Sequence, residues 1–148
     1  MIDISSHIRI ALGIEQGSVF NFFIDFNDNR RQSKNRYFVV LNRRPKTDTV
    51  LLLVTSTTQI AARLDFVRSA HISESTIVTV TTDEYPPFTK PSAFNCNDVF
   101  EVPIVDLVRK IEDGGSMNYP KMPPSVLQRI IDAVKISPRI PPSIKALL

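Results

Sequence analysis

Residue types that build common catalytic centres are scarce in this sequence. The 148 residues include one cysteine, Cys96, and two histidines, His7 and His71, which are far apart. One cysteine can form neither an internal disulfide nor a cysteine-rich zinc site, and it suits a reducing compartment. Two separated histidines without clustered carboxylates argue against other metal centres. The sequence therefore predicts a protein without a metal and without a cofactor.

Several other signatures are also missing. The four glycines form no glycine-rich run after a strand, which argues against a nucleotide-phosphate loop. Serine hydrolase chemistry lacks its nucleophile elbow, and Cys96 lies in an apolar run that favours a buried structural thiol. No apolar run approaches the roughly 20 residues that span a bilayer, and the N-terminus lacks a signal-peptide pattern. We expect a cytoplasmic protein that does not contact a membrane.

What the sequence does contain is an ordinary globular composition, 43% hydrophobic and 22% charged, which predicts one domain over residues 1–148. Runs rich in β-branched and aromatic residues predict about five strands within residues 17–102. These runs cover residues 18–26, 37–42, 50–56, 75–82 and 92–102, the last with a bulge near residues 95–97. Their connections leave no room for long crossover helices, so a small antiparallel barrel or sandwich is expected.

Helical periodicity marks both ends of the chain. Residues 3–12 form an expected N-terminal helix. Its apolar face is formed by Ile4, Ile8, Ala11 and Leu12. Residues 104–111 and 125–136 form two expected C-terminal helices, residues 144–148 a final turn, and residues 60–67 have periodicity for one or two turns. The predicted architecture is mainly β, with an N-terminal helix and two or more C-terminal helices packed on the strands.

The stretch from residue 34 to 59 contains two apolar runs joined by a basic turn. Arg36 stands where the first run begins, and Thr57 and Thr58 stand where the second ends, so we expect the functional site there. Cations are concentrated around this stretch and are opposed only by Asp28: Arg30, Arg31, Lys34, Arg36, Arg43, Arg44 and Lys46. Such a local field attracts phosphates or an acidic partner. The alternative is a solvated hairpin face that protects a sheet edge.

Arginine and threonine in a basic setting suit the binding of phosphate, because guanidinium is a permanently charged fork that matches phosphate oxygens. RNA cleavage by the 2′-hydroxyl needs no metal. It needs a cation for the phosphorane, a donor to a non-bridging oxygen, and a proton acceptor. Arg36 and Thr57 or Thr58 can fill the first two roles. The third role has no clear owner, and its candidates are Asp25, Asp28 and His71.

Aromatic side chains near this stretch offer a second type of contact with RNA. Tyr37, Phe38 or Phe88 can stack on an unpaired base, although core packing suits Phe38 better. These side chains are therefore compatible with a nucleic acid that has unpaired bases.

Three short motifs, in this order and spacing, resemble the MazF/PemK toxins. They are Gly17-Ser18-Val19-Phe20, Arg36-Tyr37-Phe38-Val39-Val40-Leu41 and Thr57-Thr58-Gln59. The resemblance covers residues 17–59, and the later strands follow only in general pattern. It implies an SH3-like, MazF/CcdB-like barrel, usually a homodimer, that cleaves single-stranded RNA without metal and is held in check by a cognate antitoxin.

Carried over by position, the resemblance places Arg36 on the catalytic arginine of these toxins and the Thr57-Thr58 pair on their catalytic threonine. The expected contacts with RNA or a partner protein are Arg30, Arg31, Lys34, Arg43, Arg44 and Gln59. Two positions depart from the family pattern. Tyr37 follows the arginine where proline is usual, and Arg31 stands where some members have a glutamate. Because arginine accepts no proton, the alternative is an inactive barrel that binds nucleic acid or an acidic protein through its basic loop.

Overall fold

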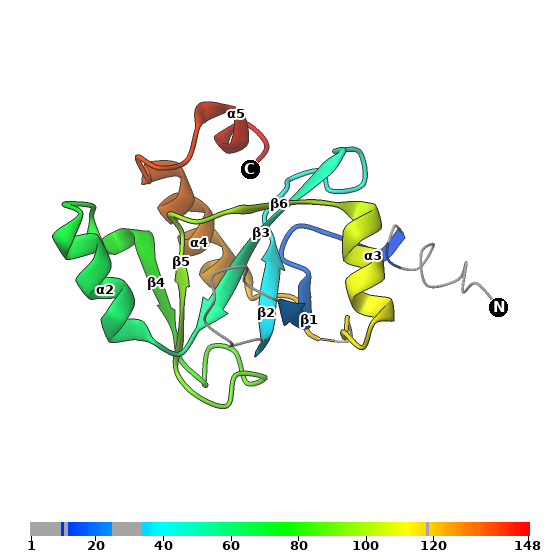
Figure 1. Cartoon of the computed structure of the whole chain (residues 1–148), viewed down its shortest axis with the longest axis horizontal. Helices are drawn as coiled ribbons and strands as arrows, with labels where there is room; N and C mark the ends of the chain where they lie inside the picture. Colours follow the sequence, from blue (N-terminus) through cyan, green and yellow to red (C-terminus); the bar gives the residue numbers. More distant parts are fainter. Residues whose placement is uncertain (1–9, 11, 25–33, 118) are drawn as a thin grey trace.

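The computed structural model describes residues 10, 12–24, 34–117 and 119–148, and its described strands form one antiparallel sheet (Figure 1). The strands are β1 (Val19–Ile24), β2 (Lys34–Val40), β3 (Val50–Thr57), β4 (Ile77–Val80), β5 (Ser92–Asn95) and β6 (Phe100–Pro103). The helices are α2 (Ile60–Ser69), α3 (Ile104–Glu112), α4 (Pro124–Ile136) and α5 (Pro142–Lys145), with a 3-10 turn at Glu74–Thr76. The predicted class, mainly β with C-terminal helices, is confirmed.

Strand β3 is the centre of the sheet. It pairs with β2 along one edge, and along the other edge with β6 at residues 50–53 and with β5 at residues 56–57. The strand order is β1-β2-β3-β5-β4, with β6 attached to β3. Within the part of the chain that the structure describes, the end strands β1 and β4 do not pair with each other. Closure into an SH3-like barrel therefore stays a prediction.

The last predicted strand is the main correction to the expected fold. One strand with a bulge was expected over residues 92–102, but the chain forms two separate strands, β5 and β6. Asn95 turns the chain between them, because its Oδ1 accepts from Asn97 N at 3.1 Å and its carbonyl accepts from Asp98 N at 3.2 Å. The turn moves the pairing from one half of β3 to the other.

The two central strands, β2 and β3, are buried on both faces at residues 38–40 and 51–54. Alternate residues enter two different cores. Val39 of β2 and Leu52 and Val54 of β3 join the core that α4 covers. Phe38 of β2 and Leu53 of β3 join the core that α3 covers, where Phe38 stacks on Phe22 at a ring-centroid distance of 4.1 Å. This double burial fixes both strands rigidly, so their ends are well positioned to carry a site.

Helices α3 and α4 lie close to their predicted bounds, and α2 continues for ten residues where one or two turns were expected. The predicted N-terminal helix over residues 3–12 falls almost wholly outside the described residues. At its end Ile10 and Ile14 are buried, whereas Leu12, expected on the apolar face, is 68% exposed. In the described chain no helix is long and apolar enough to cross a bilayer.

Candidate functional site

The start of β2 and the end of β3 meet at one edge of the sheet. Phe38 lies opposite Thr55 in the antiparallel register, so extending the register by two residues brings Arg36 level with Thr57. A pocket of about 170 Å³ opens at this edge. It is lined by Arg36, Tyr37, Ser56, Thr57, Thr58, Gln59, Phe88, Thr89, Lys90 and Ser92. The two ends of the central stretch, where the sequence predicted a site, therefore line one concave surface.

Hydrogen-bond donors cluster where β3 ends. The Oγ1 of Thr57 accepts from Gln59 N at 3.1 Å, which turns the chain into α2 and leaves the hydroxyl hydrogen of Thr57 able to donate into the pocket. Helix α2 begins at Ile60 without a side-chain cap from Gln59 and without an acidic residue in its first turn. The positive end of its dipole lies next to the pocket and favours a bound anion.

Positive charge dominates the described lining of the pocket. Arg36 is half-buried and Lys90 is exposed, and the described lining residues include no aspartate, glutamate or histidine. Burial, and secondarily the charge of Arg63 on α2, lowers the pKa of Arg36. An arginine still keeps its proton at neutral pH, so the pocket presents a permanent cation. Because the charge of Arg63 affects the pKa of Arg36, Arg63 is a third cation close to the site.

One wall of the pocket is aromatic. The ring of Tyr37 lies edge-to-face with Phe88 and with Tyr119, both at centroid distances of 5.1 Å. Tyr37 donates to the carbonyl of Pro87 at 3.3 Å. Burial, followed by the nearby Tyr119, raises the pKa of Tyr37, so its phenol is a hydrogen-bond donor and not a base at neutral pH. Phe88 is buried, as is Tyr85, whose ring lies 4.9 Å away.

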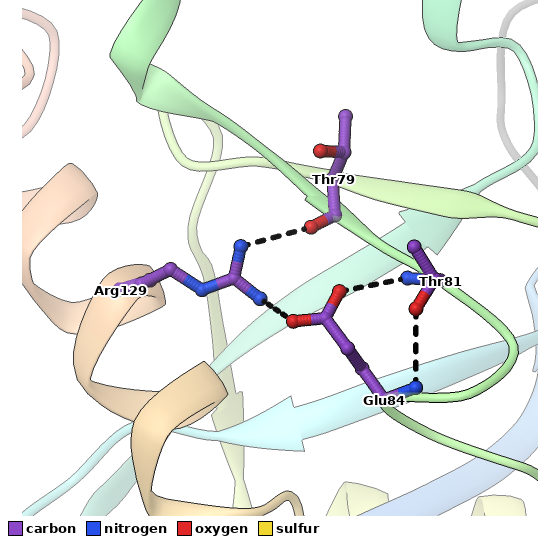
Figure 2. Close-up of polar contacts among 4 residues, drawn as sticks. All are labelled: Thr79, Thr81, Glu84 and Arg129. Carbon is purple, nitrogen blue, oxygen red and sulfur yellow. Dashed lines mark hydrogen bonds and ion pairs between the residues drawn. The ribbon is translucent and has the colours of Figure 1, made fainter.

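The segment of residues 81–91, here called the wall segment, carries Phe88, Thr89 and Lys90 into the pocket. Thr81 and Glu84 lock its first turn by bonding each other's backbone amides, at 3.0 and 3.1 Å. Figure 2 shows Arg129 of α4 reaching both this turn and β4, through an ion pair with Glu84 and a hydrogen bond to the carbonyl of Thr79. These contacts attach the wall segment to helix α4.

The structure brings together four of the predicted site residues, Arg36, Thr57, Thr58 and Gln59, as lining of one pocket. Arg43 and Arg44 do not belong to it, because they lie in the turn between β2 and β3, at the other end of both strands (Figure 1). Arg30 and Arg31 fall outside the described residues. Lys34 begins β2, where only its backbone is described.

Of the three candidate proton acceptors, one is among the described residues, and it does not line the pocket. Asp25 and Asp28 lie outside the described residues. His71 is exposed in the turn after α2, at a φ of 58°, and does not line the pocket. Burial raises the pKa of Cys96 to about 12, and its side chain is fully buried, as expected for a structural thiol. Histidine, cysteine and acidic side chains form no metal-binding cluster in the described residues.

Sequence reasoning missed several contributors to the pocket: Ser56, Arg63, Thr89, Lys90 and Ser92. No local motif marks them. Lys90 and Ser92 come from the wall segment and the start of β5, which reach the site because β5 pairs with the end of β3. Only the tertiary pairing reveals them.

Known proteins offer limited comparison. No protein-family model matches the chain, and neither does any curated protein. Among solved structures, the fold is similar to that of the Mycobacterium tuberculosis toxin MazF-mt6, with a TM-score of 0.46 and 14% identity, over 77% of this chain and 90% of that chain.

Proposed function

We propose that this protein is a toxin-type endoribonuclease that cleaves single-stranded RNA without metal and is neutralised by a cognate antitoxin. The observation that carries the proposal is that Arg36 and Thr57, far apart in the sequence, line the same cationic pocket. The aromatic wall beside them supports RNA as the ligand, because the half-buried ring of Tyr37 lines the same opening and packs edge-to-face on the buried Phe88. The sequence resemblance at residues 17–59 points to the same reaction.

The proposed step transfers the phosphoryl group from the 5′-oxygen of one nucleotide to the 2′-oxygen of the preceding nucleotide. The 2′-oxygen bonds the adjacent phosphorus, the bond from phosphorus to the 5′-oxygen breaks, and that oxygen takes up a proton. Arg36 binds the charge on the phosphorane, and the Thr57 hydroxyl donates to a non-bridging oxygen. In this proposal hydroxide from the solvent takes the proton of the 2′-hydroxyl, and water supplies the proton to the 5′-oxygen, because the described lining has no carboxylate or imidazole. We therefore expect slow cleavage that accelerates as pH rises.

Binding without cleavage is the second candidate function. The observation that favours it is the same missing acid: the described lining holds cations, hydroxyls and an amide, which bind phosphate but accept no proton at neutral pH. In that case the pocket holds the backbone of single-stranded RNA with the arrangement proposed above, and the RNA stays intact.

The test is incubation of a defined single-stranded RNA with the protein in chelator, followed by analysis of the product ends. Cleavage to 2′,3′-cyclic phosphate ends is expected for the wild type, with losses on the order of a hundredfold or more for Arg36→Ala and Thr57→Ala. Arg109→Ala is the matched control, because Arg109 is an exposed arginine on α3, at the other end of the molecule from α2 (Figure 1). RNA that shifts in a binding assay but stays intact for hours would leave only the binding function.

The proposal also includes two protein partners, an antitoxin and a second copy of the chain. Expression is expected to arrest growth in cells, and the arrest is expected to be relieved by Arg36→Ala or by co-expressing a small acidic protein from the neighbouring gene. Sedimentation of the purified protein tests the homodimer. A sedimentation coefficient that matches one chain at micromolar concentration would exclude a stable dimer.

A further inference from the structure

We propose that the turn between β2 and β3 carries a second binding site, for an acidic segment of a partner protein that inserts one apolar side chain. The site is an open pocket of about 220 Å³. It is lined by Ile14, Glu15, Gln16, Arg43, Arg44, Pro45 and Lys46. It lies at the opposite end of β2 and β3 from the pocket that holds Arg36, so a ligand bound there does not overlap that pocket.

The rim of this second site is positive. Arg43, Arg44 and Lys46 are exposed, and none of them forms an ion pair with another described residue. Glu15, the one acidic residue in its described lining, is already paired with Lys121 at 2.5 Å. The bond to Lys121, and to a smaller extent the charge of Lys46, lowers the pKa of Glu15. Three cations therefore remain available for carboxylates of a partner.

The turn that carries these cations is rigid. The fully buried Asn42 donates to Asp48 Oδ2 at 2.9 Å and to the carbonyl of Val50 at 3.0 Å, and it accepts from Leu52 N at 2.6 Å. Arg43 N donates to the carbonyl of Leu147 at 2.9 Å, which fastens the turn to the C-terminus. Because the backbone of the turn is already ordered, less conformational entropy is lost when a partner binds, and this favours binding.

Apolar contact favours a protein ligand over RNA at this site. Ile14 and Pro45 are buried residues that form the pocket's floor, and the space accommodates one large apolar side chain. No aromatic residue is part of its described lining, so an unpaired base has no ring to stack on. The pocket at Arg36 differs in this respect, since Tyr37 and Phe88 line it. Cations around an apolar floor fit a peptide with carboxylates on both sides of a leucine.

The experiment uses a fluorescent peptide, Glu-Asp-Leu-Asp-Glu, with a second peptide that has serine in place of leucine. The leucine peptide is expected to bind the wild type, and its affinity is expected to fall at least tenfold in the Arg43→Glu/Arg44→Glu double variant. The Arg109→Glu/Lys110→Glu double variant, with the same charge change on α3, is the control and keeps the affinity. The serine peptide is expected to bind several-fold more weakly than the leucine peptide.

Equal loss in both double variants, or equal affinity for the two peptides, would reduce the effect to non-specific charge attraction and overturn the proposal. The same holds if oligouridine RNA displaces the peptide from the wild type but not from Arg36→Ala. Circular dichroism and thermal unfolding of each variant confirm that it folds. RNA cleavage measured in parallel separates this proposal from the proposed function, because the Arg43→Glu/Arg44→Glu variant retains the residues of the first pocket.

Discussion

Arg129 of α4 and Glu84 of the wall segment form an ion pair that joins helix α4 to the segment lining the pocket at Arg36. Both side chains are partly exposed, at 45% and 37%. The same arginine bonds the carbonyl of Thr79, so one residue fixes the end of β4 and the turn that follows it. Since Phe88 and Lys90 enter the pocket from the wall segment, helix α4 contributes to the shape of a site that it does not line.

Replacement of Glu84 by glutamine is expected to lower stability by about 1 kcal/mol at pH 7, a typical value for a partly exposed pair with an added backbone bond. The amide of Thr81 first, and then the charge of Arg129, hold the pKa of Glu84 below its usual range. Because the folded state has the lower pKa, ionised Glu84 stabilises the fold above the unfolded pKa. That contribution is lost as pH falls through the folded pKa.

Urea unfolding of wild type and Glu84→Gln between about pH 7 and pH 3 measures this linkage. The difference in unfolding free energy is expected to shrink as the pH falls. Glu112→Gln serves as the control, since Glu112 is an exposed carboxylate at the end of α3 without an ion pair to another described residue. A difference for Glu84→Gln that stays constant over this range would contradict the assigned role of its charge.

Two tyrosines of the same aromatic cluster are expected to respond differently to loss of the hydroxyl. Tyr85 is 1% exposed and donates to the carbonyl of Pro120 at 2.6 Å, whereas Tyr37 donates to Pro87 at 3.3 Å. Tyr85→Phe is expected to lower the unfolding free energy by about 1 kcal/mol, and Tyr37→Phe by less, because a longer bond is weaker. Thermal unfolding of both variants compares them. A larger loss for Tyr37→Phe would reverse this assignment.

The single thiol reports on unfolding of the whole fold. Cys96 is fully buried, and burial raises its pKa to about 12, so almost no thiolate exists at pH 8. A thiol reagent is expected to label the folded protein at least on the order of a thousandfold more slowly than the urea-unfolded chain. Because the site has no exposed surface, variants that lower global stability should speed labelling in proportion. Rapid labelling of the folded wild type would show that the core around β5 opens locally.

Local patterns predicted the parts of the fold that depend on nearby residues. Runs of β-branched and aromatic residues predicted strands β2 and β3, and the 3.6-residue period predicted helix α4. The strand expected over residues 92–102 was wrong because its division depends on β3, which pairs with β6 and β5 at different positions. Pairing partners that are distant in the sequence leave no local signal.

The site shows the same division between local and tertiary information. The sequence placed Arg36 and Thr57 in one expected site, and both line one pocket, but the cation cluster also grouped Arg43 with them. Seven residues of extended chain separate Arg36 from Arg43, roughly 20 Å at the rise of a strand. Arg36 and Arg43 are close in the sequence but lie at opposite ends of β2 and β3. They therefore belong to two different pockets. The count of charges predicted neither surface.

Alanine is expected to destabilise the protein at both of the adjacent glycines after α3, Gly114 and Gly115, but for different reasons and to different extents. Gly114 has a φ of +106°, which strains any L-residue, but a Cβ there would meet no atom within 4 Å. A Cβ on Gly115 would lie 2.8 Å from the carbonyl oxygen of Lys110 and 3.0 Å from that of Asn21. We expect Gly114→Ala to lower the unfolding free energy by about 1–2 kcal/mol through backbone strain.

Gly115→Ala is expected to be worse, at about 3 kcal/mol, because backbone atoms must move. That movement would also disturb the bridge in which Asn21 and Ser116 exchange hydrogen bonds of 2.8 and 2.7 Å, which attaches the exit of α3 to β1. Gly13→Ala is the control, since a Cβ there has open space and no positive φ. Urea unfolding of the three variants ranks them. If Gly115→Ala is as stable as Gly13→Ala, the result would contradict the close contact between Gly115 and the backbone of β1.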